Sequence, residues 1–321
     1  MKLVVSDLSN IEGRLVAWLA GEEWKLEAFR AYDRGEGPDV YNLTAVGIVG
    51  GDPYKLSKPI RNAFGKVPDL FGAYQGGVGA AQTFCKAYSV RMADHWDTIQ
   101  QNTAPEHVAQ AYKNLEKWGR AQLAELEISE TEWLASESVK LAWRARHPAT
   151  RKLWYACEEA ARNAIRQPNA TFDAGPHLKF RCVDHVSGKW LLVRLPSGKF
   201  LTYMSPALSD EGSISYMGYG EDAEGGTVRI WSRQYTYGGH LVENCCQALA
   251  GDILKANMPP MEAAGYEIVL TVHDEAVTQT PDTDAFSSDG LSAIMATVPK
   301  WAPGLPLAAA GFESYRYKKE D

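Results

Sequence analysis

Acidic residues close two short apolar runs that lie near opposite ends of the 321-residue sequence. Leu3-Val4-Val5 leads to Asp7, and the alternating segment Glu267–Thr280 is interrupted at His273-Asp274-Glu275. We expect two strands whose terminal carboxylates are brought together by one sheet. Hard oxygen ligands of this kind hold pairs of Mg²⁺ ions about 3.5–4 Å apart at sites of phosphoryl transfer. Taken singly, each of these acids could equally be an ordinary solvated turn residue.

A second candidate group lies in the segment Arg61–Gly79. On a helix, one face would carry Lys66, Leu70 and Tyr74. This face suits a nucleotide whose phosphates contact the Lys66 ammonium and whose base lies near the Tyr74 ring. This spacing also recurs on ordinary surface helices. Pro68 would either kink the helix or mark its start. The glycines after Tyr74 lack the following Gly-Lys-Ser/Thr of a phosphate loop, so we expect them to end the helix.

Composition places the chain among ordinary globular proteins, with 45% hydrophobic and 23% charged residues. The net charge of −7 argues weakly against a nucleic-acid partner, although a basic groove is compatible with an acidic average. Five scattered cysteines without metal-site spacing predict a reduced, cytoplasmic-type protein without disulfides or structural zinc. We expect no signal peptide and no membrane span.

The elements that must position these residues change in character along the chain. Ser9-Asn10-Ile11-Glu12 matches a helix capping box. The chain from 38 to 170 favours helices, with candidates at Asp39–Val49, Glu106–Leu126 and Trp133–Ile165, the last broken at His147-Pro148.

A change of period to strand-like alternation begins at Leu178. Residues 178–203 predict three strands of a β-meander, and residues 218–226 a polar, glycine-rich loop. A helix with Leu241, Cys245, Leu249 and Ile253 on one face is expected next, before the last hairpin.

Four segments, taken together and in order, resemble the motifs of family A DNA polymerases, particularly their phage and prophage members. They are Asp7–Arg14 (motif A), Lys66–Gly77 (motif B), Thr236–Asn244 with Gln247, and Val272–Glu275 (motif C). Asp39–Ala45 and Pro303–Tyr317 also look like the phage group. The resemblance implies a mixed α+β fold: a right-hand polymerase palm, built of an antiparallel sheet with helices, and an inserted, mainly helical fingers subdomain. Residues 1–30 and 171–321 would form the palm and residues 31–170 the fingers.

The resemblance also assigns roles by position. Asp7, Asp274 and the carbonyl of Leu8 would hold two Mg²⁺ ions, for which Mn²⁺ is a substitute, and Glu275 would be a weaker catalytic acid. Lys66 would meet the triphosphate and protonate the departing pyrophosphate. The remaining implied contacts are to the nucleotide (Glu12, Arg61, Leu70, Tyr74, His273) and to the primer–template minor groove (Glu243, Asn244, Gln247).

Several of these roles have a structural alternative. Glu12, expected beside the sugar 2′ position, also fits as a cap partner, and both roles can hold. His273 fits a turn, and Asn244 and Gln247 fit solvated helix positions. The motif B arginine of the family falls on Asn62, one residue after Arg61, and its aromatic position is Leu70.

The implied activity is 5′–3′ DNA synthesis from dNTPs on primer–template DNA, in the host cytoplasm if the gene belongs to a phage. Only six residues precede Asp7. We therefore expect the thumb and proofreading exonuclease on another chain or outside this sequence, and an unpaired sheet edge along Leu3-Val4-Val5. The alternatives are a metal-dependent nuclease, a single-subunit RNA polymerase, against which Glu12 argues, and a DNA-binding fragment inactive without a thumb-bearing partner.

Overall fold

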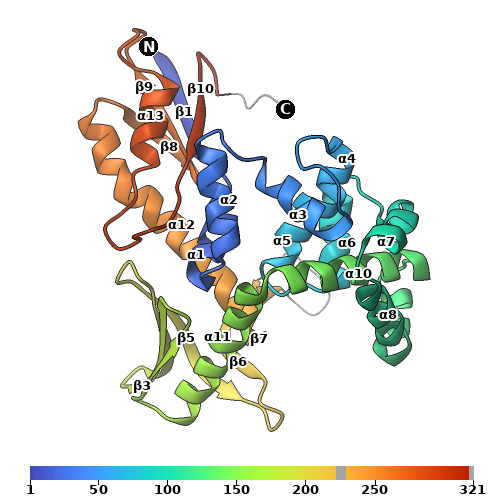
Figure 1. Ribbon diagram of the computed structural model, residues 1–321. Helices are drawn as coiled ribbons and strands as arrows, with labels where there is room; N and C mark the ends of the chain where they lie inside the picture. The colour runs from blue at the N-terminus through green and yellow to red at the C-terminus, as the bar shows by residue number, and fades with distance from the viewer. Residues whose placement is uncertain (222–228, 318–321) are drawn as a thin grey trace. The chain divides into compact units, whose positions relative to one another are not determined.

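The computed structural model describes residues 1–221 and 229–317 (Figure 1). Contacts within the chain divide it into two units, each built from separate stretches of sequence. The sheet unit comprises Met1–Leu19, Glu159–Thr236 and Glu243–Asp321, and the helical unit comprises Ala20–Glu158 and Tyr237–Val242. The fold is mixed α+β, as the sequence predicts.

The first sheet of the sheet unit has four antiparallel strands in the order β10-β1-β9-β8. These strands are β1 (Lys2–Leu8), β8 (Glu267–Val272), β9 (Glu275–Thr280) and β10 (Ala309–Ser314). The predicted unpaired edge at Leu3-Val4-Val5 is wrong, because Leu3 is opposite Ser314 on one side and Gln279 on the other. One of these partners is strand β10, which the sequence pattern does not reveal. Val4 and Val5 are consequently at most 1% exposed.

Two helices, α13 (Ser288–Met295) and α1 (Ile11–Ala20), accompany this sheet. Helix α13 is capped by Ser287, whose hydroxyl accepts from the Gly290 amide. The hydroxyl of Ser292 on this helix lies 2.8 Å from that of Ser6 in β1, in a buried contact. Helix α1 starts one residue later than the predicted capping box implies, because its first backbone bond runs from the Arg14 amide to the Asn10 carbonyl.

The second sheet is a six-stranded antiparallel meander in sequence order. Its strands are β2 (Thr171–Ala174), β3 (Leu178–His185), β4 (Gly188–Arg194), β5 (Phe200–Leu208), β6 (Ile214–Glu221) and β7 (Arg229–Thr236). The three predicted strands are confirmed as β3, β4 and β5. The predicted loop at 218–226 is wrong for its first four residues, which end strand β6, and its remainder lies outside the described residues.

Helix α12 (Gly238–Ala263) follows this sheet and is the predicted long helix. The side chains of Leu241, Cys245, Leu249 and Ile253 are all completely buried, which confirms the predicted apolar face. Each of the chain's five cysteines is free and buried. None of the described helices is long and apolar enough to cross a membrane.

The helical unit is built from short helices. They are α2 (Glu23–Asp33), α3 (Val40–Val49), α4 (Lys58–Arg61), η1 (Asn62–Lys66), α5 (Val67–Gly72), α6 (Val78–Ala87), η2 (Met92–His95), α7 (Trp96–Asn102), α8 (Pro105–Asn114), η3 (Leu115–Gly119), α9 (Arg120–Glu125) and α10 (Glu130–Arg146). Helix α11 (Pro148–Arg166) continues beyond it. The expected helix at Asp39–Val49 is confirmed, with the Asp39 carboxylate capping the Tyr41 amide, and so is the break at His147-Pro148. The stretch expected at Glu106–Leu126 is helical in three consecutive segments.

Candidate active site

The two predicted acidic strand ends meet in the first sheet. Strand β1 runs antiparallel to β9 with Asp7 opposite Glu275, and the Leu8 amide donates to the Asp274 carbonyl over 3.3 Å. Asp7 and Asp274 are both partly exposed. The fold thus brings together, at one end of β1, carboxylates from the two ends of the sequence.

Glu275 differs from the other two acids in its surroundings. It is the first residue of β9, not a turn residue as the sequence suggested, and it is 2% exposed. One carboxylate oxygen accepts a 2.6 Å hydrogen bond from the Tyr317 hydroxyl. Because a directly opposed pair shares one face of a sheet, Glu275 lies on the same face as Asp7. Tyr317 was given no individual role by the sequence, and only a long-range contact identifies it.

His273 and Asp274 form the turn between β8 and β9. His273 is exposed and has a φ of 56°, a left-handed conformation that is uncommon for residues other than glycine. Its imidazole is therefore carried at a sharply turned point of the backbone beside Asp274.

The donor set at this end of β1 suits a hard divalent cation. Two carboxylates, those of Asp7 and Asp274, and the Leu8 carbonyl are oxygen donors of the type that Mg²⁺ prefers. Within the described residues, no group of three or more His, Cys, Asp and Glu side chains has the spacing of a metal site. A set of two acids and a backbone carbonyl does not require such a group.

Motif A is joined to helix α12 by a direct contact. Gln247 of α12 donates a 2.6 Å hydrogen bond to the carboxylate of Glu12 in the first turn of α1. Asn244, one turn earlier on α12, donates to the Tyr203 hydroxyl of β5 over 3.0 Å. Glu243 is half-buried on the same helix, whereas Gln247 is exposed. The structure therefore brings Glu12 and Gln247 together and places Asn244 against the second sheet.

In the helical unit, the predicted motif B residues lie partly in helices and partly in a turn. Lys66 ends η1, with its ammonium 4.4 Å from the centre of the Tyr88 ring, and Leu70 lies in α5. Pro68 is in the first turn of α5, which continues directly from the π-helix η1, so it lies within a continuous helical run from 58 to 72 and does not mark a helix start. The prediction that Tyr74 continues this helical face is wrong, because α5 ends at Gly72 and Tyr74 lies in the following turn.

Arg61 is engaged within the helical unit. Its guanidinium donates to the Asp39 carboxylate at 2.6 Å and lies 4.9 Å from the centre of the Tyr41 ring. Asp39 is also the cap of α3, so this cluster fixes the start of α3 against α4. In this arrangement the Arg61 guanidinium is occupied by a protein carboxylate.

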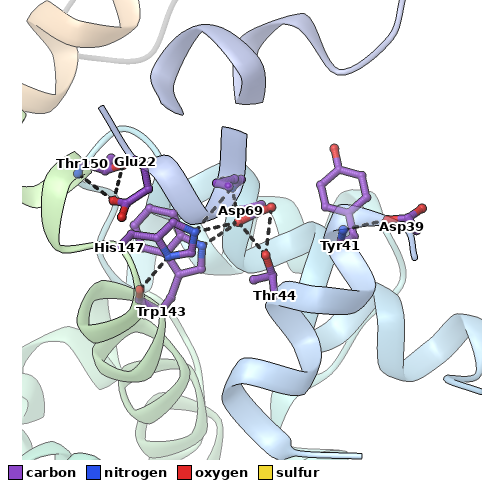
Figure 2. A network of polar contacts seen from close by, with 9 residues as sticks. Glu22, Asp39, Tyr41, Thr44, Asp69, Trp143, His147 and Thr150 are labelled. Carbon is purple, nitrogen blue, oxygen red and sulfur yellow. Dashed lines mark hydrogen bonds and ion pairs between the residues drawn. The ribbon is translucent and has the colours of Figure 1, made fainter. Parts of the chain in front are cut away.

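A buried polar network, which the sequence did not indicate, holds the helix after Lys66 (Figure 2). The Asp69 carboxylate of α5 accepts from Trp143 Nε1 at 2.7 Å and from Thr44 Oγ1 at 3.3 Å. The Lys25 ammonium of α2 pairs with it at 2.9 Å, and both charged side chains are about 6% exposed. The α5 helix is thereby joined to α2, α3 and α10 by charge-assisted bonds in a dry environment.

His147 completes this network at the junction of α10 and α11. Its Nδ1 lies 2.8 Å from the Trp143 carbonyl, which only accepts, so Nδ1 carries the proton. Nε2 then faces the Lys25 ammonium at 3.5 Å. Burial, together with the positive charges of Lys25 and Arg146, holds the pKa of His147 well below its ordinary value. The ring is therefore neutral at physiological pH.

The chain is similar in sequence to a DNA polymerase from Bacillus phage SP02. The two are 33% identical over 323 residues, covering 98% of this chain and 41% of the phage protein. The chain therefore spans about two fifths of the length of this relative. No family model matches the sequence.

Among solved structures, the fold is similar to the POL domain of Pol1 from M. smegmatis, determined in complex with DNA primer-template and dNTP. The TM-score is 0.51 at 15% sequence identity, and the match covers 98% of this chain and 40% of that one. At this identity the similarity concerns the fold alone. The resemblance to a DNA polymerase that the ordered motifs predict is confirmed by the phage relative, and the predicted fold by this structure.

Proposed function

We propose that this chain is the catalytic part of a template-directed DNA polymerase, which adds dNTPs to a primer 3′ end by two-metal nucleotidyl transfer. The observation that supports it is the pairing of β1 with β9, which sets Asp7 beside Asp274 and Glu275. In a chain similar to a phage DNA polymerase, such a carboxylate pair would bind the metal ions of nucleotidyl transfer. The sheet unit would act as the palm and the helical unit as the fingers.

Asp7, Asp274 and the Leu8 carbonyl would hold the ions, Mg²⁺ or in its place Mn²⁺. When bound, such ions lower the pKa of an attacking hydroxyl and stabilise charge on the attacking and leaving oxygens. Asp7 and Asp274 are partly exposed, whereas Glu275 is buried and accepts a hydrogen bond from the Tyr317 hydroxyl. Glu275 therefore has a supporting role in the proposal.

The remaining residues would bind and orient the reactants. Lys66 is the principal cation for the triphosphate and the proton donor to the leaving pyrophosphate, because Arg61 is paired with Asp39. Leu70 and Tyr74 would pack against the base and sugar, Glu12 would exclude the 2′-hydroxyl, and His273 would lie near the primer end. Glu243, Asn244 and Gln247 would contact the minor groove. If the chain is phage-encoded like its relative, the host cytoplasm is its place of action.

Primer extension with purified protein, dNTPs and Mg²⁺ tests the proposal. Removing either metal ligand should cost several kcal/mol of transition-state stabilisation, so Asp7→Ala and Asp274→Ala should slow nucleotide addition roughly 10³-fold or more. Glu275→Ala should have a smaller effect. Asp210→Ala, an exposed acid in the turn between β5 and β6, is the matched control and should leave the rate unchanged.

Three outcomes would redirect the proposal. Normal extension by folded Asp7→Ala protein would contradict the metal-ligand assignment. Degradation of the primer without extension would favour a nuclease. Binding of primer–template without synthesis, converted to synthesis by a thumb-bearing chain, would identify this polypeptide as a fragment that needs a partner.

A further inference from the structure

The second sheet has one covered face and one open face. Alternate residues of each strand point to opposite faces, and the inward set is buried. Phe180, Cys182, Leu191 and Val193 are at most 1% exposed, while Tyr203 from the same face meets Asn244 of α12. The outward set is exposed or half-buried from β3 across to β7, apart from buried Ser215.

Positive charge is concentrated on the open face. Lys179, Arg181, Arg194 and Arg233 all point outward and are exposed. Among the outward residues whose side chains are described, Asp173, paired with Lys179, is the one acid. In a protein with a net charge of −7, this sheet face has the opposite sign to the molecule as a whole.

Aromatic rings lie among these cations. Phe200, Tyr219, Trp231 and Tyr235 are 54%, 68%, 46% and 70% exposed. Tyr219 and Trp231 are opposite each other on β6 and β7, with ring centres 4.9 Å apart in an edge-to-face arrangement. Large rings exposed together on one face indicate an interaction surface.

We propose that this open face binds single-stranded DNA, which goes beyond the proposed catalytic function. Guanidinium and ammonium groups neutralise the phosphates, and exposed rings stack on unpaired bases. A duplex hides its base faces and would leave these rings unused. Lys179 and Arg194 are directly opposite on β3 and β4, and Arg181 is two residues along β3, so these three cations form a cluster. Phe200 of β5 lies directly opposite Arg194 and places an aromatic ring beside it.

The experiment measures, by fluorescence anisotropy, the binding of a fluorescein-labelled oligo(dT) of about 16 nucleotides, without dNTPs or divalent ions. Joint substitution of Tyr219→Ala and Trp231→Ala should weaken binding roughly tenfold or more, since each stacked base is lost. Joint Arg181→Gln and Arg194→Gln should lower the slope of log K against log salt by about 0.7 for each phosphate contact removed. Tyr54→Ala and Arg91→Gln, which change exposed residues of the helical unit, are the matched controls.

The two pairs of substitutions should weaken the binding of oligo(dT) more than the binding of a duplex of equal length, because the proposed polymerase site binds duplex elsewhere on the chain. The inference is overturned if folded variants of both pairs keep wild-type affinity and salt slope for oligo(dT), or if they weaken duplex binding to the same extent. If the aromatic pair does not fold by circular dichroism, the arginine pair alone decides. Asp7→Ala should retain oligo(dT) binding, so failure of the catalytic proposal is distinguishable from failure of this one.

Discussion

Glu12 is subject to two local constraints, of which the sequence indicated only its place at the start of a helix. Its carboxylate lies in the first turn of α1, where negative charge is favourable, and it accepts a hydrogen bond from Gln247 at 2.6 Å. The contact joins a motif A residue to a motif of helix α12. A sugar-excluding position for Glu12 would thus depend on Gln247 for its orientation.

We predict that Glu12→Ala raises the use of ribonucleotides relative to deoxyribonucleotides, and that Gln247→Ala does so to a smaller extent. The ratio of kcat/KM for rCTP and dCTP measures this effect. Glu23→Ala, which removes an acid from the first turn of α2, is the control and should leave the ratio unaltered. An unchanged ratio in Glu12→Ala, with stability lowered by about 0.5–2 kcal/mol, would reduce Glu12 to a helix-terminus residue.

At the scale of elements, the sequence predicts those helices and strands whose residues show a clear local pattern. Strands β3, β4 and β5 alternate clearly, and Asp39 is a good helix cap. Strand β6 was overlooked because Gly218 and Gly220 weaken its intrinsic preference, and pairing with β7 supplies what the sequence lacks. Tyr74 was misplaced for a related reason, since helical spacing does not reveal that α5 ends before it.

At the candidate site too, the sequence predicts residues with a local signal and misses those that depend on packing. Asp7 and Asp274 were identified because acids at strand ends are visible in sequence. The pairing of Lys25 with Asp69 was not, because it depends on the packing of α2 against α5 within the helical unit. Nothing in the local sequence distinguishes a buried aspartate in a first helical turn from a solvated one.

The junction of α10 and α11 should make stability depend on pH. His147 faces Lys25 and Asp69, with Arg146 adjacent, and its pKa is held well below the ordinary value, chiefly by burial. The unfolded chain takes up a proton near pH 6.5, whereas the folded chain does so only at lower pH. Stability is therefore fully present above about pH 6.5 and should fall by up to about 1.4 kcal/mol per pH unit below it.

Denaturant unfolding at several pH values between 5 and 8 measures this dependence. His147→Gln keeps a polar side chain without a titrating ring, so its unfolding free energy should decline less steeply between pH 6.5 and 5. The exposed His185→Gln is the control and should follow the wild type. Equal slopes for wild type and His147→Gln would show that another group governs the acid limb.

At the scale of the whole molecule, the chain divides into two units, each with buried side chains of its own. The Asp69 network lies wholly in the helical unit, and the carboxylates of β1 and β9 lie wholly in the sheet unit. Local stability differs across a structure and is measurable amide by amide. A defect in one core should therefore be distinguishable from a defect in the other.

We predict that Asp69→Ala, which leaves the Lys25 ammonium buried without its partner carboxylate, destabilises the helical unit by about 3–5 kcal/mol. Hydrogen exchange should accelerate for the amides of α3, α5 and α10, while those of β1 and β9 keep wild-type protection. Lys25→Met combined with Asp69→Leu should recover much of the loss, because it removes both charges. Equal acceleration in both units would mean that they unfold as one.

The central position of β1 has a consequence for how the protein is made. Its two neighbours, β9 and β10, follow it by more than 250 residues, so β1 must wait for that length of chain to be synthesised before it is paired in this sheet. Closing so long a loop is entropically costly, and contacts between distant parts of a sequence form slowly. A growing chain therefore has Asp7 without Asp274 and Glu275 beside it until β9 has been synthesised, and the carboxylate pair is assembled only after that point.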